Sequence, residues 1–248
     1  NYSIFIYNLN SLGTSNAVIF SNTISSGIQQ TNKISDTGLV KIIDNTISGI
    51  GSHYGQGPHI KNNTINRISL EESKNFLVEN NLIESSPTSQ QTTIGMNITG
   101  KSIGTVKYNN LINNATVQPS NSALNIHNSN ITVQYNTITA GSTSTIRVNC
   151  LGVINCSIID SNNIYNTTVG GYTIWNWGNV DINTLNNYWG TTSSSEIDNK
   201  IYDFYDDPSL GNVIYNPFAL AEIGSKAITS FDFATPVATG VINEIAHT

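Results

Sequence analysis

The hexapeptide Ile60-Lys-Asn-Asn63-Thr-Ile65 is one copy of a pattern that recurs along the chain. In this pattern an apolar residue is followed three positions later by Asn, and two positions after that by a second apolar residue. Seven copies fit, at residues 19–24, 42–47, 60–65, 78–83, 106–111, 133–138 and 159–164. They begin 18 to 28 residues apart, which is about one solenoid turn with surface loops of variable length. The chain is therefore expected to be a repeat protein.

Between the copies, apolar and polar residues alternate in short runs, which is typical of strands with one buried face. Each turn contains about three such runs; one middle run has Ile94, Met96 and Ile98. A degenerate eighth copy, residues 182–188, has Leu185 where the Asn is expected. The sequence thus predicts an all-β, right-handed, single-stranded parallel β-helix of about eight turns, with three strands per turn and an irregular C-terminal cap.

The recurring Asn has a physical explanation. Asn tolerates the left-handed backbone that a tight bend requires, and its amide can both donate and accept hydrogen bonds. Stacked at the strand spacing of about 4.8 Å, such amides can bond to the copies above and below. We predict a structural ladder without a chemical role, formed by Asn22, Asn45, Asn63, Asn81, Asn109, Asn136 and Asn162.

Composition limits the classes of partner. Only 10% of the 248 residues are charged, the formal net charge is -6, and the ten Lys and Arg are scattered singly. Because nucleic acids and anionic membranes attract clustered basic residues, binding to either is disfavoured. Apolar runs long enough to span a membrane are lacking, so we expect no membrane insertion. The first residues also lack the features of a signal peptide, and the chain reads as a piece of a longer protein.

The repeat rhythm breaks after residue 186, which suggests three segments. We predict a parallel β-helix over residues 1–190, a cap over residues 191–220, and a strand-forming tail over residues 221–248. A solenoid must close its last exposed strands against solvent and other chains, and the aromatic residues between 188 and 204 suit that role.

The C-terminal motifs carry a resemblance. Asn187-Tyr-Trp-Gly-Thr191, Ile201-Tyr-Asp203 and Val213-Ile-Tyr-Asn-Pro217 resemble the last turn and cap of right-handed parallel β-helix repeat proteins from archaeal and bacterial cell surfaces. The resemblance covers about residues 10–218. It implies a secreted, modular protein with pectate-lyase-like architecture. The tail from Ala227 resembles the first strands of an immunoglobulin-like module, although it could instead pair with another sheet edge.

Catalytic candidates are sparse. Lyases of this fold need calcium-binding acids beside a base, and hydrolases need two or three close carboxylates. Between Glu84 and Asp181 the only acidic residue is Asp160. We therefore expect no enzymatic activity. If the chain is an enzyme, we expect a polysaccharide lyase or a glycoside hydrolase.

One surface is a candidate binding site. Strand alternation places Trp175 and Trp177 on the same outer face, above Arg147, Asn149 and His127, with Tyr172 on the opposite face. Aromatic rings on a flat sheet can stack against sugar rings, so we predict a carbohydrate patch. The alternative is that the tryptophans pack beneath the cap.

Further residues are candidates for a metal site, a disulfide and N-glycosylation. Asp203 and Asp206 in the cap are expected either to bond to backbone amides or to hold calcium, the one cofactor considered. Cys150 and Cys156 could form a disulfide or remain two buried thiols. Sequons that permit N-glycosylation without proving it occur at Asn1, Asn62, Asn97, Asn114, Asn130, Asn155 and Asn166.

The expected function is that of a non-catalytic extracellular protein, a subunit of a surface layer, filament or adhesin. Its expected partners are copies of itself, joined end to end or by strand donation, and a cell-surface polysaccharide. The alternative is a polysaccharide-binding module or a polysaccharide-active enzyme on the same fold.

Overall fold

The computed structural model describes residues 4–7, 17–25, 27–31, 40–54, 56–85, 94–114, 122–152 and 156–224. Most of the predicted tail, residues 225–248, and the sequons at Asn1 and Asn155 lie outside this part of the chain. The side chains of residues 4–7 and 31 also lie outside the description.

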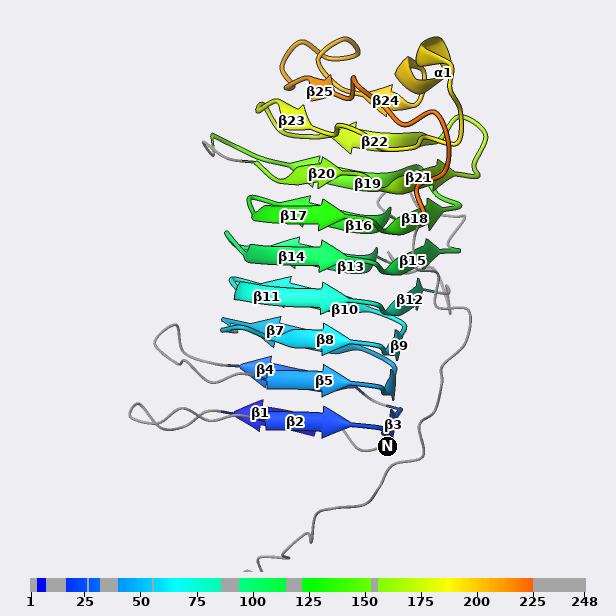
Figure 1. The fold of residues 1–248 in the computed structure, drawn as a ribbon. Helices are drawn as coiled ribbons and strands as arrows, with labels where there is room; N and C mark the ends of the chain where they lie inside the picture. The colour runs from blue at the N-terminus through cyan, green and yellow to red at the C-terminus, as the bar shows by residue number, and fades with distance from the viewer. Residues whose placement is uncertain are drawn as a thin grey trace, which may run out of the picture.

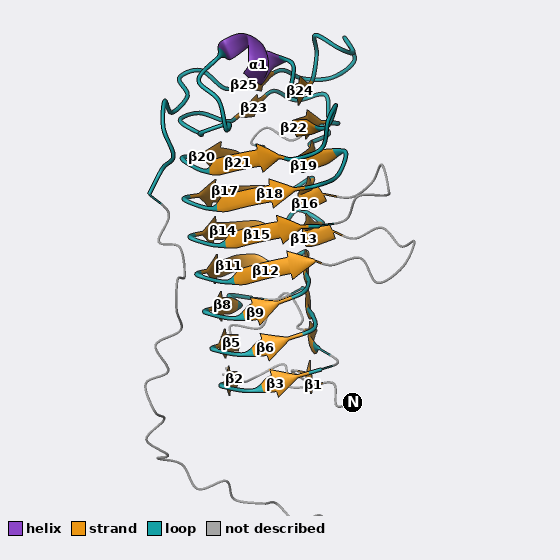
Figure 2. Cartoon of the chain, turned by 90° about the vertical axis from the view of Figure 1, so that its right-hand side faces the viewer, coloured by secondary structure: helices purple, strands orange, loops and turns teal. Residues whose placement is uncertain are grey.

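Three parallel sheets make up the molecule (Figure 1). Sheet A contains β1 (Ile4–Tyr7), β4 (Ile28–Thr31), β7 (Ile50–His53), β10 (Ile68–Glu71), β13 (Ile94–Thr99), β16 (Ser122–His127), β19 (Ser144–Asn149), β22 (Tyr172–Asn176) and β24 (Ile201–Tyr202). Sheet B contains β2 (Ala17–Phe20), β5 (Val40–Ile43), β8 (His59–Lys61), β11 (Lys74–Glu79), β14 (Ile103–Lys107), β17 (Asn130–Gln134), β20 (Ile158–Asp160), β23 (Ile182–Asn183) and β25 (Val213–Ile214). Sheet C, which faces the viewer in Figure 2, contains β3 (Thr23–Ile24), β6 (Thr46–Ile47), β9 (Thr64–Ile65), β12 (Leu82–Ser85), β15 (Asn110–Asn113), β18 (Thr137–Ala140) and β21 (Asn163–Asn166).

Each turn of chain visits sheets A, B and C in that order and then begins the next turn directly above. Neighbouring strands in each sheet are therefore parallel and come from successive turns. The right-handed parallel β-helix predicted from the repeats is confirmed. Because sheet C has only seven strands, the number of complete turns is slightly smaller than the eight predicted.

The core is built from columns of identical or similar side chains. The first apolar residue of each repeat lies in sheet B, where Ile42 pairs in register with Ile60, and Val78 with Val106. The last apolar residue lies in sheet C, where it is equally buried. Burying one such side chain stabilises the fold by about 1.5–3 kcal/mol. A one-residue slip would expose a whole column, so the repeat spacing fixes the register.

The Asn residues line the corner between sheets B and C. For Asn63, the side-chain Nδ2 donates to Oδ1 of Asn81 at 2.9 Å, to the carbonyl of Ile42 and to the carbonyl of Lys61. Its own backbone N–H donates to Oδ1 of Asn81 at 2.9 Å. The same pattern joins all seven predicted members into one column.

The prediction that the ladder Asn adopts the left-handed backbone of the bend is wrong. The left-handed residue is the one before each ladder position, such as Asp44 (φ 56°), Tyr108 (φ 57°) and Ser161 (φ 57°). The ladder Asn itself does not have this conformation. It is required because its amide reaches both the neighbouring turn and its own strand, satisfying backbone groups that the corner leaves unpaired.

The ladder also has an eighth member that the pattern does not reveal. Oδ1 of Asn187 accepts from the backbone N–H and Nδ2 of Asn162 at 2.8 and 3.0 Å. The corner keeps its usual length, because Ile158 pairs with Asn183 before it and Asn163 pairs with Tyr188 after it, with the same offset on both sides. The buried Thr184, three positions before Asn187, therefore takes the place of the first apolar residue, and its carbonyl accepts from Nδ2 of Asn187. Leu185, at the position expected from a count that begins at Ile182, is half-buried and lies outside the ladder.

A shorter ladder of Ser residues occupies the corner between sheets A and B. Ser73 donates through its hydroxyl to Ser52 Oγ at 3.2 Å, and its backbone N–H donates to Ser102 Oγ at 3.0 Å. The backbone N–H of Ser102 in turn donates to Ser129 Oγ at 3.2 Å. These hydroxyls are buried and satisfy the second corner as the Asn amides satisfy the first.

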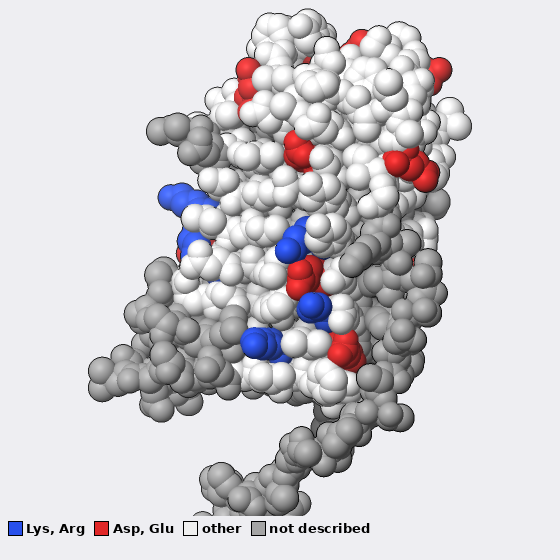
Figure 3. All heavy atoms as spheres, in the orientation of Figure 1, with Lys and Arg blue, Asp and Glu red and all other residues white. Residues whose placement is uncertain are grey.

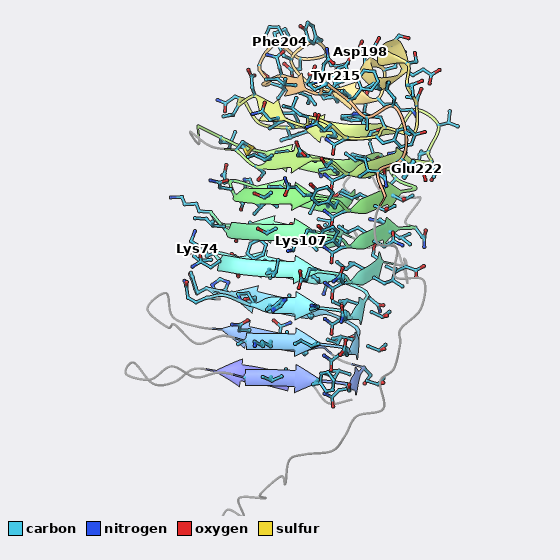
Figure 4. The ribbon with its side chains drawn as sticks, viewed as in Figure 1. Lys74, Lys107, Asp198, Phe204, Tyr215 and Glu222 are labelled. Carbon is cyan, nitrogen blue, oxygen red and sulfur yellow. A yellow bond between two sulfur atoms is a disulfide. The ribbon has the colours of Figure 1, made fainter. Side chains whose placement is uncertain are left out.

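The C-terminal cap covers the last turn. It contains the short helix α1 (Ser194–Asp198), β24, β25 and the buried Trp189. Tyr215 packs against Trp189 and donates to Asp198 at 2.6 Å, and Figure 4 shows Tyr215 and Asp198 close together on the cap. Burial, together with this hydrogen bond to a carboxylate, raises the pKa of Tyr215 to about 12.

After the cap, the chain turns back along the solenoid. The backbone N–H of Ile223 donates to Asn163 Oδ1 at 2.8 Å, and Nδ2 of Asn163 donates to the Ile223 carbonyl at 2.8 Å. Nearby, Tyr165 donates to Glu222 at 2.7 Å. Burial first, and then this hydrogen bond and the charge of Glu222, raise the pKa of Tyr165. The returning segment is thus fixed to β21.

The outer face of sheet B has alternating charges on successive turns. Glu79 accepts from Lys61 and His59 through Oε1 at 3.3 and 3.1 Å, and Oε2 lies 3.4 Å from Lys107 Nζ. Burial alone would raise the pKa of Glu79, but the hydrogen bonds from His59, Lys61 and Lys107 together lower it below its usual value. The ionised carboxylate is therefore more stable in the folded protein than in the unfolded chain.

Replacing Glu79 with Gln tests this contribution. A carboxyl whose folded pKa is depressed stabilises the fold above its unfolded pKa, which is about 4.3 for Glu, and loses this effect as the pH falls through the folded value. We expect Glu79→Gln to lower the free energy of unfolding by about 1–2 kcal/mol at pH 7 and by much less near pH 3. Urea unfolding at both pH values measures this, with the exposed Glu84→Gln as control. An equal loss at both pH values would contradict the charge argument.

Candidate functional site

An outward column of sheet A brings the predicted patch together. Asn97 pairs in register with Asn125, Asn125 with Arg147, Arg147 with Trp175, and Trp175 with Tyr202. The regular strand spacing therefore stacks two amides, a guanidinium and two aromatic rings on one flat face. The next outward column places His127 in register with Asn149.

Arg147 lies against two indole rings. Its Cζ is 5.3 Å from the ring centroid of Trp175 and 5.4 Å from that of Trp177, within the range of cation–π interactions. Among the described residues it has no hydrogen-bond acceptor and no carboxylate partner, and its Nε is buried. Burial lowers the pKa of Arg147, although guanidinium remains charged at ordinary pH.

Four aromatic side chains form a cluster beside this arginine. The ring centroids of Trp175 and Trp177 lie 4.7 Å apart, and Trp175 lies 5.3 Å from Tyr202 and 5.9 Å from Tyr172. The prediction that Tyr172 lies on the opposite face is therefore wrong. Thr173 and Ile174 are both buried, so the alternation breaks at the start of β22 and Tyr172 joins the outer cluster.

The two tryptophans differ in their contact with the cap. Tyr202 of the cap packs against Trp175, which is half-buried. Trp177 remains 47% exposed. One indole thus supports the cap and the guanidinium, while the other presents apolar surface to solvent.

A depression of about 280 Å³ lies beside the cluster. It is lined by Ile94, Asn125, His127, Arg147, Val148, Asn149 and Trp177. Oδ1 of Asn149 and Nε1 of Trp175 are buried without a hydrogen-bond partner among the described residues. These two atoms and Nε of Arg147 are covered by protein, so a ligand in the depression would contact the exposed parts of the lining side chains instead.

A second depression of about 510 Å³ continues along the same face toward the N-terminus. Ile94 lines both depressions, and Asn97 and Ser69 continue the outward column into the second one. Its edge carries Glu71, which pairs with His53 at 2.7 Å. The two depressions share Ile94 and follow the outward column of sheet A; together they are called the groove of sheet A.

The described carboxylates do not converge on this groove as a catalytic pair. Most accept a hydrogen bond from a nearby protein group: Glu71, Glu79, Glu84, Asp160, Asp181, Glu196, Asp198, Asp203, Asp206, Asp207 and Glu222. Asp160, the acid nearest the middle turns in sequence, belongs to sheet B and bonds to Ser161 and Asn186.

The cap aspartates bond to backbone amides, the first of the two roles expected for them. Asp203 accepts from the backbone N–H groups of Tyr205 and Val213 at 3.0 and 2.8 Å, and Asp206 accepts from the N–H of Asp203 at 3.1 Å. Calcium needs six to eight oxygen ligands. The described part of the chain contains no group of three or more His, Cys, Asp or Glu that could hold a metal.

The remaining candidates have clear positions. Cys150 and Cys156 form a disulfide across the loop that connects β19 to β20. Among the sequons, Asn114 and Asn130 are exposed, whereas Asn62 and Asn97 are half-buried. The amide of Asn166 donates to two backbone carbonyls, at 3.0 and 2.8 Å, and is thus poorly placed for a glycan.

The chain matched no protein-family model, no curated protein and no solved structure. Among the described residues, α1 is five residues long, and no helix there could cross a membrane.

Proposed function

We propose that the protein is a non-catalytic structural protein displayed outside the cell, as a subunit of a surface layer, a filament or an adhesin. One observation carries this proposal: the amide ladder and the apolar columns continue from Asn22 to Asn187. Such a solenoid is quasi-one-dimensional, with each turn stabilised by its neighbours. It is suited to act as a stiff spacer. The resemblance to bacterial and archaeal surface proteins, including their following immunoglobulin-like modules, supports the same role.

The non-catalytic part of the proposal is supported by the carboxylates. Most of them stabilise loops, corners or the cap through hydrogen bonds, as described above. Glycoside hydrolysis needs an acid and a second carboxylate on either side of one bond. Among the described residues, the groove of sheet A offers Arg147 and His127 without such a pair.

Contacts between copies are supported by the distribution of charge. Residues 108–224 contain eight acidic and two basic side chains, whereas residues 17–107 contain six acidic and seven basic ones. On the face shown in Figure 3, only acidic side chains appear near the C-terminal end. This polarity favours head-to-tail stacking over contacts between two acidic ends.

Electron microscopy of the purified chain over a range of protein concentrations tests the assembly. We expect end-to-end filaments or sheets whose formation changes with salt, because exposed charges are screened beyond about 10 Å at 0.1 M salt. Particles that remain strictly monomeric at high concentration would contradict the proposal.

An activity screen tests the non-catalytic part. Uronate polymers should release neither unsaturated nor reducing sugars on incubation with the protein. Release that disappears in Arg147→Ala or Asp160→Ala would instead identify a polysaccharide-active enzyme.

A second candidate function, polysaccharide binding, is favoured by the exposed part of Trp177 beside the polar groove of sheet A. It is compatible with the structural role, because a rod at the cell surface can carry a binding face.

A further inference from the structure

We propose that the groove of sheet A binds an acidic polysaccharide, with the carboxylate of one sugar on Arg147 and the ring of that sugar against Trp177. This proposal rests on the second candidate function and adds the class of ligand and its orientation.

The first argument is the uncompensated charge of Arg147. The guanidinium is half-buried, and the described residues give it no acceptor and no carboxylate. Elsewhere in the protein, cations such as Lys61 and Lys107 share a carboxylate. A partly desolvated cation without a counter-ion is unfavourable, so an anionic ligand gains more here than it would on an open surface.

The second argument is the contact of the guanidinium with the two indoles. The two indoles hold Arg147 by stacking, at 5.3 and 5.4 Å, and thereby restrict its rotamers. A pre-ordered guanidinium binds carboxylate through two parallel hydrogen bonds with little loss of entropy. Nδ2 of Asn125 donates to Asn97 at 2.7 Å, which leaves its Oδ1 to accept from a sugar hydroxyl, and Nδ2 of Asn149 can donate to one.

The third argument is shape. The groove follows the outward column of sheet A from Ser69 to Trp175, four strand spacings, or about 19 Å. An extended chain of sugars fits this form better than a compact ligand. Trp177 lies at the C-terminal end of the groove, where its exposed ring surface can stack on a sugar.

The charges along the groove set the position of the acidic sugar. Glu71 lies on the edge of the groove, on β10, three strands before β19 in sheet A. Three spacings amount to about 14 Å, beyond the screening length of about 8 Å at physiological ionic strength. Arg67 and His53 line the same depression as Glu71, so the N-terminal part of the groove carries both signs of charge, and Glu71 interferes little at Arg147.

Calorimetric titration of the full chain with oligogalacturonate, and with the same oligomer fully methyl-esterified, tests the proposal. The two probes share their rings and differ in charge. We expect the acidic probe to bind about 10-fold to 100-fold more tightly, the value of a charge-assisted hydrogen bond. Added salt should weaken the acidic probe alone.

Variants assign the two contacts. Arg147→Ala should remove the preference for the acidic probe, and Arg147→Lys, which retains charge without the fork, should restore only part of it. Trp177→Ala should weaken both probes. The matched controls are Lys41→Ala in β5 of sheet B and Tyr205→Ala in the cap, which change a cation and an exposed aromatic residue outside the groove and should leave both affinities unchanged. Thermal melting verifies that each variant is folded.

The outcomes separate this proposal from the one on which it rests. Equal affinity for the two probes would overturn the acidic class while leaving polysaccharide binding intact. Unchanged selectivity in a folded Arg147→Ala would overturn the assigned contact. Failure of both probes to bind at millimolar concentration would overturn polysaccharide binding itself.

Discussion

Replacing Asn109 with Ala is expected to lower the free energy of unfolding by about 3–5 kcal/mol. The Asn109 amide donates to Val78, Lys107 and Asn136, at 2.9, 2.9 and 3.0 Å. Its Oδ1 accepts from the backbone N–H and Nδ2 of Asn81, each at 2.9 Å. Alanine removes all five bonds, and each buried group left without a partner costs about 1–3 kcal/mol. The groups share one site, so their costs do not add fully.

Asn110→Ala is the matched control for this variant. Asn110 follows directly in the chain and is half-buried in β15, outside the amide ladder. Chemical denaturation monitored by circular dichroism should show a loss of less than about 1 kcal/mol for Asn110→Ala. Equal losses for the two variants would show that a ladder Asn contributes no more to stability than a neighbouring Asn outside the ladder.

Trp189→Ala is expected to cost about 3–5 kcal/mol, the usual loss for deleting a buried large aromatic side chain. Trp189 is only 1% exposed and packs against Tyr215 in the cap. Its removal leaves a cavity above the last complete turn. Because a solenoid can open from one end, we expect the C-terminal turns to unfold at lower temperature than the rest.

Trp177→Ala provides the comparison for this prediction, since the same change is made at a tryptophan that is 47% exposed. Its melting temperature should remain within about 2 °C of the unmodified protein. Hydrogen exchange can locate the effect: in Trp189→Ala, protection should be lost first in β22 to β25. Uniform loss along the whole rod would contradict a capping role.

The amide ladder shows how far a sequence pattern can carry structural prediction. Seven members are evident because spacing and residue type recur together. Asn187 escapes the pattern because the buried Thr184 stands three positions before it, where the other copies have Ile or Val. The left-handed residues before the ladder also escape it, since positions such as Ser21, Asp44 and Tyr108 share no side-chain chemistry.

The sheet A site was predictable in its members but not in its contacts. Alternation within the strands places Arg147 and Trp175 outward. It fails for Tyr172, because the start of β22 turns two successive residues, Thr173 and Ile174, toward the core. Whether Arg147 has a carboxylate partner depends on the side chains that the neighbouring turns place beside it. These side chains lie more than twenty residues away in the sequence.

The sequence by itself determined the architecture of this protein. The pattern repeats once per turn, with an apolar residue on each side of Asn. Only directly stacked turns bury all of these apolar residues and give each corner Asn a hydrogen-bond partner in the next turn. The tertiary structure alone decided which polar groups are left without partners. That outcome depends on distances between side chains of different turns, which strand alternation does not encode: the carboxylates lie beside donors, while Arg147 lies beside two indoles.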